Sequence, residues 1–183
     1  GARKTCPYVM GFIKCAILAS MGELLAVRIT TKAWRAPAGM PFRTLIWGVL
    51  GAVTTLMFGV FSSGVTGMIA AGMLDVGTTF PGLFTAFYIS AIMNLAFAPA
   101  FMGLHRMTDT YIDLVCEGGQ AGLTKVIARI DWDGFIKFVI LKTVPFFWIP
   151  AHTLVFLLPP EYRILAAAFL SIALGAILAY AKR

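Results

Sequence analysis

The sequence predicts an all-α integral membrane protein, a bundle of four to five transmembrane helices with short amphipathic helices on its basic face. Of the 183 residues, 60% are hydrophobic and only 13% are charged, whereas roughly a quarter of the residues in soluble domains are charged. The mean hydropathy is +0.87. Residues 44–74 and 76–104 contain no Asp, Glu, Lys or Arg, and each stretch is long enough to cross a bilayer. No internal repeat or shift of composition divides the chain, so we expect one transmembrane helical domain over residues 1–183.

Five apolar segments are candidate spans, and they follow one another along the chain as residues 7–27, 44–64 with an extension to 74, 83–104, 143–158 and 164–180. The last two are short, about 24 to 27 Å long at about 1.5 Å per residue. Short segments tilt, thin the bilayer or pair as a broken hairpin. The sequence therefore predicts either five spans or four full spans and a partial one.

The basic residues favour an odd number of crossings. With five spans, one face of the membrane collects most of them: Arg28, Lys32, Arg35, Arg43, Arg106, Lys125, Arg129, Lys137, Lys142, Lys182 and Arg183. The opposite face keeps only Arg3, Lys4 and Arg163. Tryptophans, whose rings prefer the headgroup level, fall on the same basic face: Trp34, Trp47 and Trp132. Since basic residues concentrate on one side of membrane proteins, this bias supports the five-span arrangement.

Between the third and fourth segments, apolar residues recur with helical spacing in two short runs. The first run consists of Met107, Tyr111, Leu114 and Val115, and the second consists of Leu123, Val126, Ile127 and Ile130. The sequence GGQAG separates them. We expect either two amphipathic helices lying on the basic surface of the membrane or a small helical cap on the water side.

The composition argues against several classes of function. The net charge of +7 comes without a basic patch interleaved with stacking aromatics, so nucleic-acid binding is not expected. The three cysteines, Cys6, Cys15 and Cys116, have no CxxC spacing and predict neither a disulfide framework nor a metal site. With two histidines, no paired carboxylates, no phosphate-binding loop and no activated nucleophile, we expect no catalytic, cofactor or metal site. The expected partners are membrane lipids and other membrane protein subunits.

Small residues recur every four positions in the second span: Gly59, Ser63, Gly67 and Ala71. This small-residue stripe lets a neighbouring helix approach closely, so we expect it to be a packing surface. The alternative is a narrow polar groove that also includes Thr54, Thr55 and Ser62.

Four polar residues inside the apolar segments are candidates for structural partners or pore lining: Lys14, Glu23, Asn94 and His152. An intramembrane charge costs roughly 2.5 to 3.5 kcal/mol on insertion scales, so each such residue is a functional candidate. Lys14 and Glu23 lie nine positions apart, on opposite helix faces and about 13 Å apart along the axis, so they cannot pair with each other.

Each of the four also has a structural interpretation. Lys14 lies near the end of its segment and can snorkel to the interface. Glu23 lies within reach of two basic residues, Arg28 and Arg43. We expect the Asn94 amide to hydrogen-bond a neighbouring helix, and we expect His152 to bond a nearby carbonyl left free by Pro150.

Several short motifs are spread nearly end to end along the chain: Pro7, Gly22-Glu23, Phe42-Arg43-Thr44, Gly48, Asn94, Phe97-Ala98-Pro99-Ala100-Phe101-Met102-Gly103, Trp148, Pro150, Pro159, Tyr162 and Arg163. In these motifs the chain resembles the family of the twenty-two-kilodalton peroxisomal membrane protein and its mitochondrial inner-membrane relatives, the Mpv-seventeen proteins. The sequence departs from the family's pattern at Val27, at Asn94-Leu95 and around His152 and Leu154, where the family carries more polar residues.

The resemblance implies a small-solute channel in an organellar membrane, with the proline-rich breakers as a signature of the fold. Polar groups that could line a water-filled path are sparse here. The first hypothesis is therefore a non-enzymatic accessory or structural subunit of a respiratory-chain or ATP synthase complex. We expect it in the mitochondrial inner membrane, with its basic face toward the matrix. The alternative is a weakly selective small-solute channel of a mitochondrial or peroxisomal membrane. A third interpretation is a lipid-binding protein that uses the amphipathic runs of residues 107–130.

Overall fold

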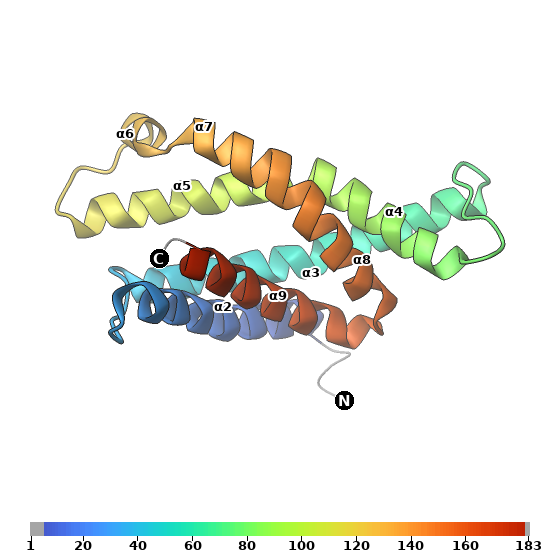
Figure 1. Ribbon diagram of the computed structural model, residues 1–183, viewed down its shortest axis with the longest axis horizontal. Coiled ribbons are helices and arrows are strands. Elements are labelled where there is room, and N and C mark those ends of the chain that lie inside the picture. Colours follow the sequence, from blue (N-terminus) through green and yellow to red (C-terminus); the bar gives the residue numbers. More distant parts are fainter. Residues whose placement is uncertain (1–5, 182–183) are drawn as a thin grey trace.

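The computed structural model describes residues 6–181, with side chains described for residues 6–177. All regular secondary structure in that part of the chain is helical (Figure 1). In chain order the elements are α2 (Pro7–Thr31), α3 (Met40–Ala70), α4 (Pro81–Ala96), α5 (Ala98–Cys116), α6 (Leu123–Arg129), α7 (Trp132–Gly134), the π-helix η1 (Phe135–Trp148), α8 (Ile149–Leu157) and α9 (Pro160–Ala181). The basic residues Arg3, Lys4, Lys182 and Arg183 lie outside the described residues.

Prolines mark where helices begin. α2, α3, α4, α5 and α8 each carry a proline at one of their first two positions, and α9 starts with Pro160. The first turn of a helix has no acceptor for these amides, so a residue without an N–H is tolerated there. Most of these prolines therefore lie at helix starts, whereas Pro145 lies inside η1.

Four helical segments are long and apolar enough to cross a membrane: Pro7–Thr31, Met40–Ala70, Trp132–Leu157 and Pro160–Ile177. The pair α4 and α5 adds a fifth when it is counted as one span bent by 47°. The predicted all-helical chain with four to five span-like helices is therefore confirmed at the level of helix length and composition.

Two predicted boundaries are wrong. The segment predicted as a continuous span over residues 83–104 is broken at Phe97, because Pro99 cannot donate a backbone hydrogen bond to Leu95 and its ring crowds that carbonyl. The fourth segment begins at Trp132 rather than at residue 143. In its first turns the Lys137 ammonium lies 2.7 Å from the carboxylate of Asp133, four residues earlier.

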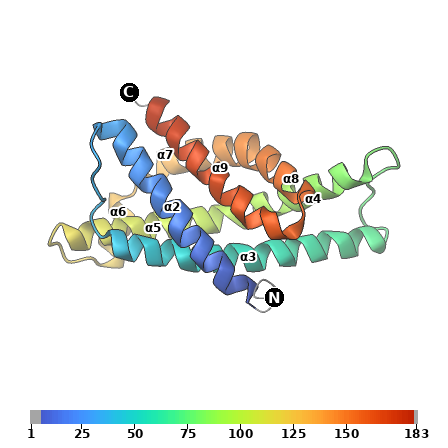
Figure 2. The ribbon, with the colours of Figure 1, turned by 90° about the horizontal axis from the view of Figure 1, so that it is seen from below.

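Glycines determine how closely α2 and α3 cross. A Cβ atom added at Gly11 would overlap the Thr55 side chain, and one added at Gly51 would overlap Cys15. α2 also lies along α9, and α4 lies against α8 (Figures 1 and 2). The core between these helices contains Val65, Ile89, Met93, Val155 and Phe156, among others. Small residues thus bring the helices together, and larger apolar residues fill the space between them.

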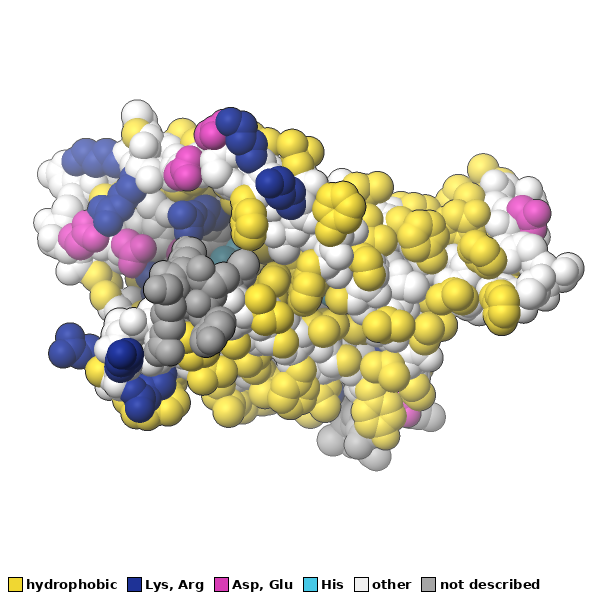
Figure 3. All heavy atoms as spheres, in the orientation of Figure 1, with side chains coloured by type: hydrophobic (Ala, Val, Ile, Leu, Met, Phe, Trp, Pro, Cys, Tyr) yellow, Lys and Arg dark blue, Asp and Glu magenta, His cyan; other side chains and the backbone are white. Residues whose placement is uncertain are grey.

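Charged side chains gather at one end of the molecule, where α2 is followed by α3 and α5 is followed by α6 (Figure 3). Apolar side chains cover the middle of the visible face. The end of α9 also lies toward this charged end (Figure 1). This arrangement agrees with the alternating directions of the five predicted segments and with a shared basic end, which we call the basic end of the bundle.

The first predicted amphipathic run is not a separate short helix. It forms the second half of α5, which continues without interruption from Ala98. The second run forms α6, and Gly118 between them has a positive φ of 77° that allows the chain to turn. The Arg129 side chain on α6 donates hydrogen bonds to the Glu117 carboxylate at the end of α5.

Candidate functional site

A central cavity of about 270 Å³ lies inside the bundle and is lined by residues of α2, α3, α4, α5, η1, α8 and α9. Its walls are mainly apolar, and the polar side chains among them are Trp47, Thr54, Asn94, His105, Trp148, His152 and Ser171. On α3 the lining runs from Trp47 to Phe58, which corresponds to about 16 Å along a helix. The cavity therefore covers about half of a typical hydrocarbon thickness of roughly 30 Å.

Toward the middle of the bundle, the cavity wall contains a polar group that we call the Asn94–His152 cluster, formed by Ser90, Asn94, Trp148 and His152. Asn94 is 1% exposed and Ser90 is fully buried. Asn94 Nδ2 lies 3.0 Å from His152 Nδ1, and Asn94 Oδ1 lies 3.2 Å from the same nitrogen. Asn94 Nδ2 also donates to the Ser90 carbonyl at 2.9 Å, and Ser90 Oγ donates to the Ile149 carbonyl at 2.7 Å. These bonds tie α4 to α8.

The expected partner of His152 was wrong. We expected a carbonyl freed by Pro150, but His152 Nδ1 bonds the Asn94 side chain on another helix. The imidazole is held by two rings, since it stacks on Trp148 with centroids 5.0 Å apart and meets the Phe58 ring edge-on. Because an amide can donate or accept, the pair remains bonded in either tautomer of the histidine. Trp148 Nε1 also lines this wall and has no hydrogen-bond partner among the described residues.

The second polar group lies at the basic end and consists of Glu23, Arg43, Trp47, His105, Asp109 and Asp113; we call it the basic-end cluster. Arg43 Nη1 lies 3.0 Å from Asp109 Oδ1, and Arg43 Nη2 lies 2.6 Å from Asp113 Oδ1. Arg43 Nε donates to the Ala38 carbonyl at 3.0 Å. The guanidinium therefore joins the start of α3 to α5 while its side chain is only 11% exposed.

Glu23 and His105 complete the basic-end cluster. Trp47 Nε1 donates to Glu23 Oε1 at 2.6 Å, so tryptophan is the direct partner of this carboxylate, rather than the expected Arg28 or Arg43. The Trp47 ring lies against the His105 ring with centroids 4.2 Å apart. Glu23 Oε2 and His105 Nε2 are buried and have no hydrogen-bond partner among the described residues. Trp47 and His105 line the central cavity, so this cluster closes the cavity toward the basic end.

Three side chains of the basic-end cluster could hold a metal ion. Glu23, His105 and Asp109 each offer one ligand atom, and these atoms lie within 4.8 Å of one another. The sequence analysis found no set of metal ligands, because Glu23 lies on α2 and the other two lie on α5. The only local signal is the spacing of His105 and Asp109, which are four residues apart and therefore on one helix face.

The structure separates the predicted polar residues into two groups. Asn94 and His152 lie together on the cavity wall, and Glu23 lies in the basic-end cluster. Lys14 is half-buried on α2 and is not among the residues that line the central cavity. The structure therefore does not bring all four residues together along one pore.

The small-residue stripe faces outward. Gly59, Ser63, Gly67 and Ala71 are all exposed, and a Cβ atom added at Gly59 or Gly67 would have nothing within 4 Å. Within the described chain, close helix approach occurs at Gly11, Gly48 and Gly51 instead. That a helix packs against the stripe thus remains a prediction, and that helix would belong to another molecule.

Several of the family-like residues have structural positions that the contacts explain. Pro7, Pro99 and Pro150 start helices, and Pro159 directly precedes α9. Phe97 lies at the break between α4 and α5. Gly22 lies against Ile172 of α9, whereas Gly103 has open space around it and Tyr162 is exposed.

Arg163 and Trp148 belong to the same set, and their contacts also explain their positions. Arg163 donates to the carbonyls of Leu158 and Phe156 at 2.9 and 3.1 Å, and its guanidinium lies over the Phe156 ring. It therefore satisfies carbonyls at the end of α8 that have no helical partner. Trp148 holds the His152 ring by stacking.

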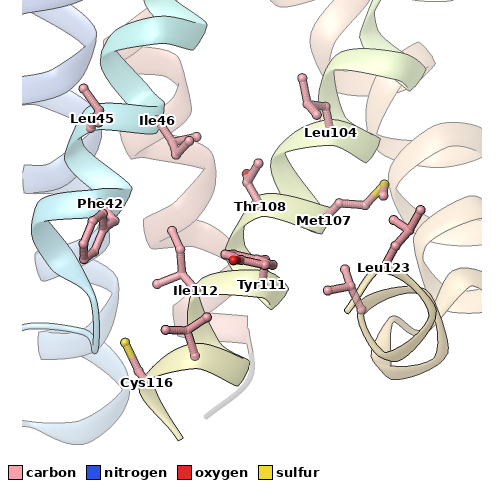
Figure 4. A pocket seen from close by; sticks show the side chains of 12 residues that line it. Phe42, Leu45, Ile46, Leu104, Met107, Thr108, Tyr111, Ile112, Cys116 and Leu123 are labelled. Carbon is pink, nitrogen blue, oxygen red and sulfur yellow. The ribbon is translucent and has the colours of Figure 1, made fainter. Parts of the chain in front are cut away.

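A separate apolar groove of about 660 Å³ lies between the start of α3, the second half of α5, and α6 (Figure 4). Phe42, Leu45 and Ile46 form one wall, and Met107, Tyr111 and Leu123 contribute to the other. Residues of both predicted amphipathic runs thus line this groove.

No protein-family model, curated protein or solved structure matches the chain in comparisons with known proteins.

Proposed function

We propose that this chain is a multi-span helical membrane protein that takes a small polar solute into its central cavity and passes it across an organellar membrane, as a weakly selective channel. The observation that carries the proposal is the Asn94–His152 cluster on the wall of a cavity inside the bundle. Sequence analysis placed the channel second, because polar residues are sparse. The contacts favour it because two of the four intramembrane polar candidates, Asn94 and His152, meet on the wall of one internal space.

The chemistry of the wall suits a small solute that both donates and accepts hydrogen bonds. Trp148 and His105 line the cavity, and their Nε1 and Nε2 atoms are buried without a hydrogen-bond partner among the described residues. An unpaired buried polar group costs about 1–3 kcal/mol. A solute or water that bonds them offsets that cost. The amide and imidazole of the Asn94–His152 cluster can exchange donor and acceptor roles, which is a basis for weak selectivity.

The cavity volume limits the solute. At about 270 Å³ it is smaller than the roughly 300–1,000 Å³ of sites for drug-sized ligands. Since one water molecule occupies about 30 Å³ in the liquid, the cavity holds a solute of a few heavy atoms with some water. Larger metabolites are excluded on size.

Passage requires the two ends of the cavity to open. The basic-end cluster closes one end through the Trp47 and His105 rings, and the rings of Phe58 and Phe156, with centroids 4.9 Å apart, pack beside the other polar group. The break at Phe97 and the π-helix η1 around Pro145 are the irregular backbone elements next to the cavity. Irregularities of this kind are frequent at functional hinges in helices.

The proposed location is the mitochondrial inner membrane, with the peroxisomal membrane as the alternative. It follows from the resemblance to the Mpv-seventeen proteins, and the proposal includes membership of that family. The basic end of the bundle would then face the matrix, in line with the enrichment of Lys and Arg on one side of membrane proteins.

Flux of small polar solutes into liposomes containing the purified protein tests the proposal. We expect flux for solutes of a few heavy atoms, a large loss in Asn94→Leu, and no change in Thr66→Val. Thr66 is an exposed residue of α3 whose hydroxyl bonds its own helix, away from the cavity. Circular dichroism of both variants confirms that helices are retained. Absence of flux in the wild-type protein, or unchanged flux in Asn94→Leu, contradicts a channel lined by this cluster.

A second candidate function is the accessory or structural subunit of a respiratory-chain or ATP synthase complex. It is favoured by the small-residue stripe of α3, whose four residues are all exposed. Small residues allow a partner helix to approach, and helix association in lipid depends on such packing.

Purification in mild detergent followed by native mass spectrometry tests this second function. We expect a membrane complex to co-purify with the wild-type chain and to be lost in the double variant Gly59→Leu, Gly67→Leu. Gly82→Leu is the matched control, since this glycine of α4 is also exposed and has nothing within 4 Å of an added Cβ. Retention of the complex in the double variant excludes the stripe as its interface.

A further inference from the structure

We infer that the basic-end cluster is a divalent metal site, in which Glu23, His105 and Asp109 bind one transition-metal ion of the Zn²⁺ type. The inference goes beyond the proposed channel and stands whether or not the central cavity conducts. It rests on the spacing of the three side chains, on their unpaired atoms and on the residues that hold them in place.

The spacing fits ligands of one ion better than it fits direct bonds between the side chains. The three ligand atoms lie within 4.8 Å of one another. His105 Nδ1 and Asp109 Oδ2 are 3.6 Å apart, which is too far for a hydrogen bond. Two ligands at about 2.1 Å from a tetrahedral ion are separated by about 3.4 Å. This pair is therefore spaced as two ligands of a common cation.

The unpaired atoms belong to the same side chains. Glu23 Oε2 and His105 Nε2 are buried without a hydrogen-bond partner among the described residues. Asp109 Oδ1 meets Arg43 across an ion pair of 3.0 Å but makes no hydrogen bond of good geometry. Buried polar atoms nearly always have a partner, so each such atom calls for an explanation by water, an ion or a ligand. A cation bound by Glu23 Oε2, His105 Nδ1 and Asp109 Oδ2 gives Glu23 Oε2 the partner that it lacks.

Neighbouring residues orient the ligands. Trp47 Nε1 holds Glu23 through Oε1, which leaves Oε2 available. Arg43 holds Asp109 through Oδ1, so Oδ2 faces His105. Hydrogen bonds from surrounding residues commonly position the ligands of metal sites in this way.

The local charge allows a divalent cation to enter. Three carboxylates, from Glu23, Asp109 and Asp113, face the guanidinium groups of Arg43 and Arg106. When the carboxylates are ionised, the five groups carry a net charge of −1, from three negative and two positive groups. A cation therefore approaches a negative rather than a positive cluster.

The ligand set indicates the class of metal. Imidazole favours Zn²⁺, Cu²⁺, Fe²⁺ or Ni²⁺, while carboxylates alone suit Mg²⁺, Ca²⁺ and Mn²⁺. One histidine with two carboxylates therefore fits Zn²⁺ better than Mg²⁺ or Ca²⁺. Three protein ligands would leave a fourth position for water or a solute. His105 also lines the central cavity. The ion would join α2 to α5 at the basic end.

The test is calorimetric titration of Zn²⁺ into the full-length chain in detergent, after removal of any affinity tag and treatment with chelator. We expect one saturable Zn²⁺ site per chain that excess Mg²⁺ does not displace. Glu23→Gln, His105→Gln and Asp109→Asn each should weaken binding by about tenfold or more. His152→Gln and Glu161→Gln are the matched controls and should bind Zn²⁺ as the wild-type chain does, because they change a histidine and an exposed carboxylate outside the basic-end cluster.

A second readout keeps the inference testable where a variant does not fold. Co²⁺ added to the wild-type protein should give the intense visible absorption of tetrahedral Co²⁺, and Zn²⁺ should abolish it by competition. Absence of saturable binding and of this absorption in the wild-type chain overturns the inference. So does Zn²⁺ binding that is unchanged in folded Glu23→Gln and His105→Gln.

Discussion

Replacing Arg43 by Met is expected to destabilise the bundle mainly through Asp109 rather than through Asp113. The two ion pairs of Arg43 differ in length and in burial, and we predict that burial decides which pair contributes more. The Arg43–Asp113 contact is the shorter one, at 2.6 Å compared with 3.0 Å for Asp109. The Asp109 side chain, however, is 21% exposed and the Asp113 side chain is 44% exposed.

The expected magnitudes follow from that difference in burial. Removing one partner of a buried ion pair costs about 3–5 kcal/mol, because the other charge is left without compensation. Exposed ion pairs contribute about 0–1 kcal/mol. We therefore expect Arg43→Met to lower the free energy of unfolding by about 3 kcal/mol. We expect a coupling energy of about 2 kcal/mol between Arg43 and Asp109, and below about 1 kcal/mol between Arg43 and Asp113.

Double-mutant cycles measure these coupling energies. The single variants Arg43→Met, Asp109→Asn and Asp113→Asn, with the two double variants, would be unfolded in mixed micelles by increasing the mole fraction of denaturing detergent, with helix content followed by circular dichroism. Chelator keeps metal ions out of the comparison. Arg35→Met is the control, since this arginine is exposed between α2 and α3. A coupling of Arg43 to Asp113 that equals or exceeds its coupling to Asp109 would refute the reasoning that burial outweighs distance here.

Three further predictions concern the α2–α3 crossing, the α5–α6 connection and the end of α8. Gly51→Val should destabilise the bundle by about 1–3 kcal/mol through overpacking, whereas Gly67→Val, with open space around it, should not change the detergent unfolding midpoint of the isolated chain. The hydrogen bond from Arg129 holds the pKa of Glu117 below its ordinary value of 4.5. The stabilisation from this ion pair is therefore complete above about pH 4.5 and is lost as the pH falls through the lowered pKa. Backbone hydrogen exchange in residues 117–123, corrected for intrinsic rates, should rise in that pH range in the wild-type chain, whereas in a Glu117→Gln variant it should already be high and should not rise further. Arg163→Met should leave two carbonyls at the end of α8 without their donor, lowering stability by about 1–3 kcal/mol in the same unfolding assay, and an unchanged midpoint would argue against the capping role.

The span-like helices could be predicted because the transfer of a residue from water to hydrocarbon depends mainly on that residue and its immediate neighbours. Apolar runs of sufficient length therefore identified α2, α3 and α9. The errors arose where a local pattern has two outcomes. Pro99 is compatible with a kinked span or with two helices, and the packing of α4 against α8 accompanies the bend at Phe97. The apolar run of the fourth segment starts at residue 143, but the helix begins at Trp132 and includes the more polar residues before that run.

The sequence by itself determined which polar residues need partners, because the cost of placing Glu23, Asn94 or His152 in an apolar helix is a local property. Only the tertiary structure decided which partners they have. Asn94 and His152 are 58 positions apart and meet because α4 lies against α8, and Glu23 meets Trp47 because α2 crosses α3 where glycines permit close approach. The rotation and crossing of helices depend on how all their side chains pack together, so periodicity along one helix does not specify them.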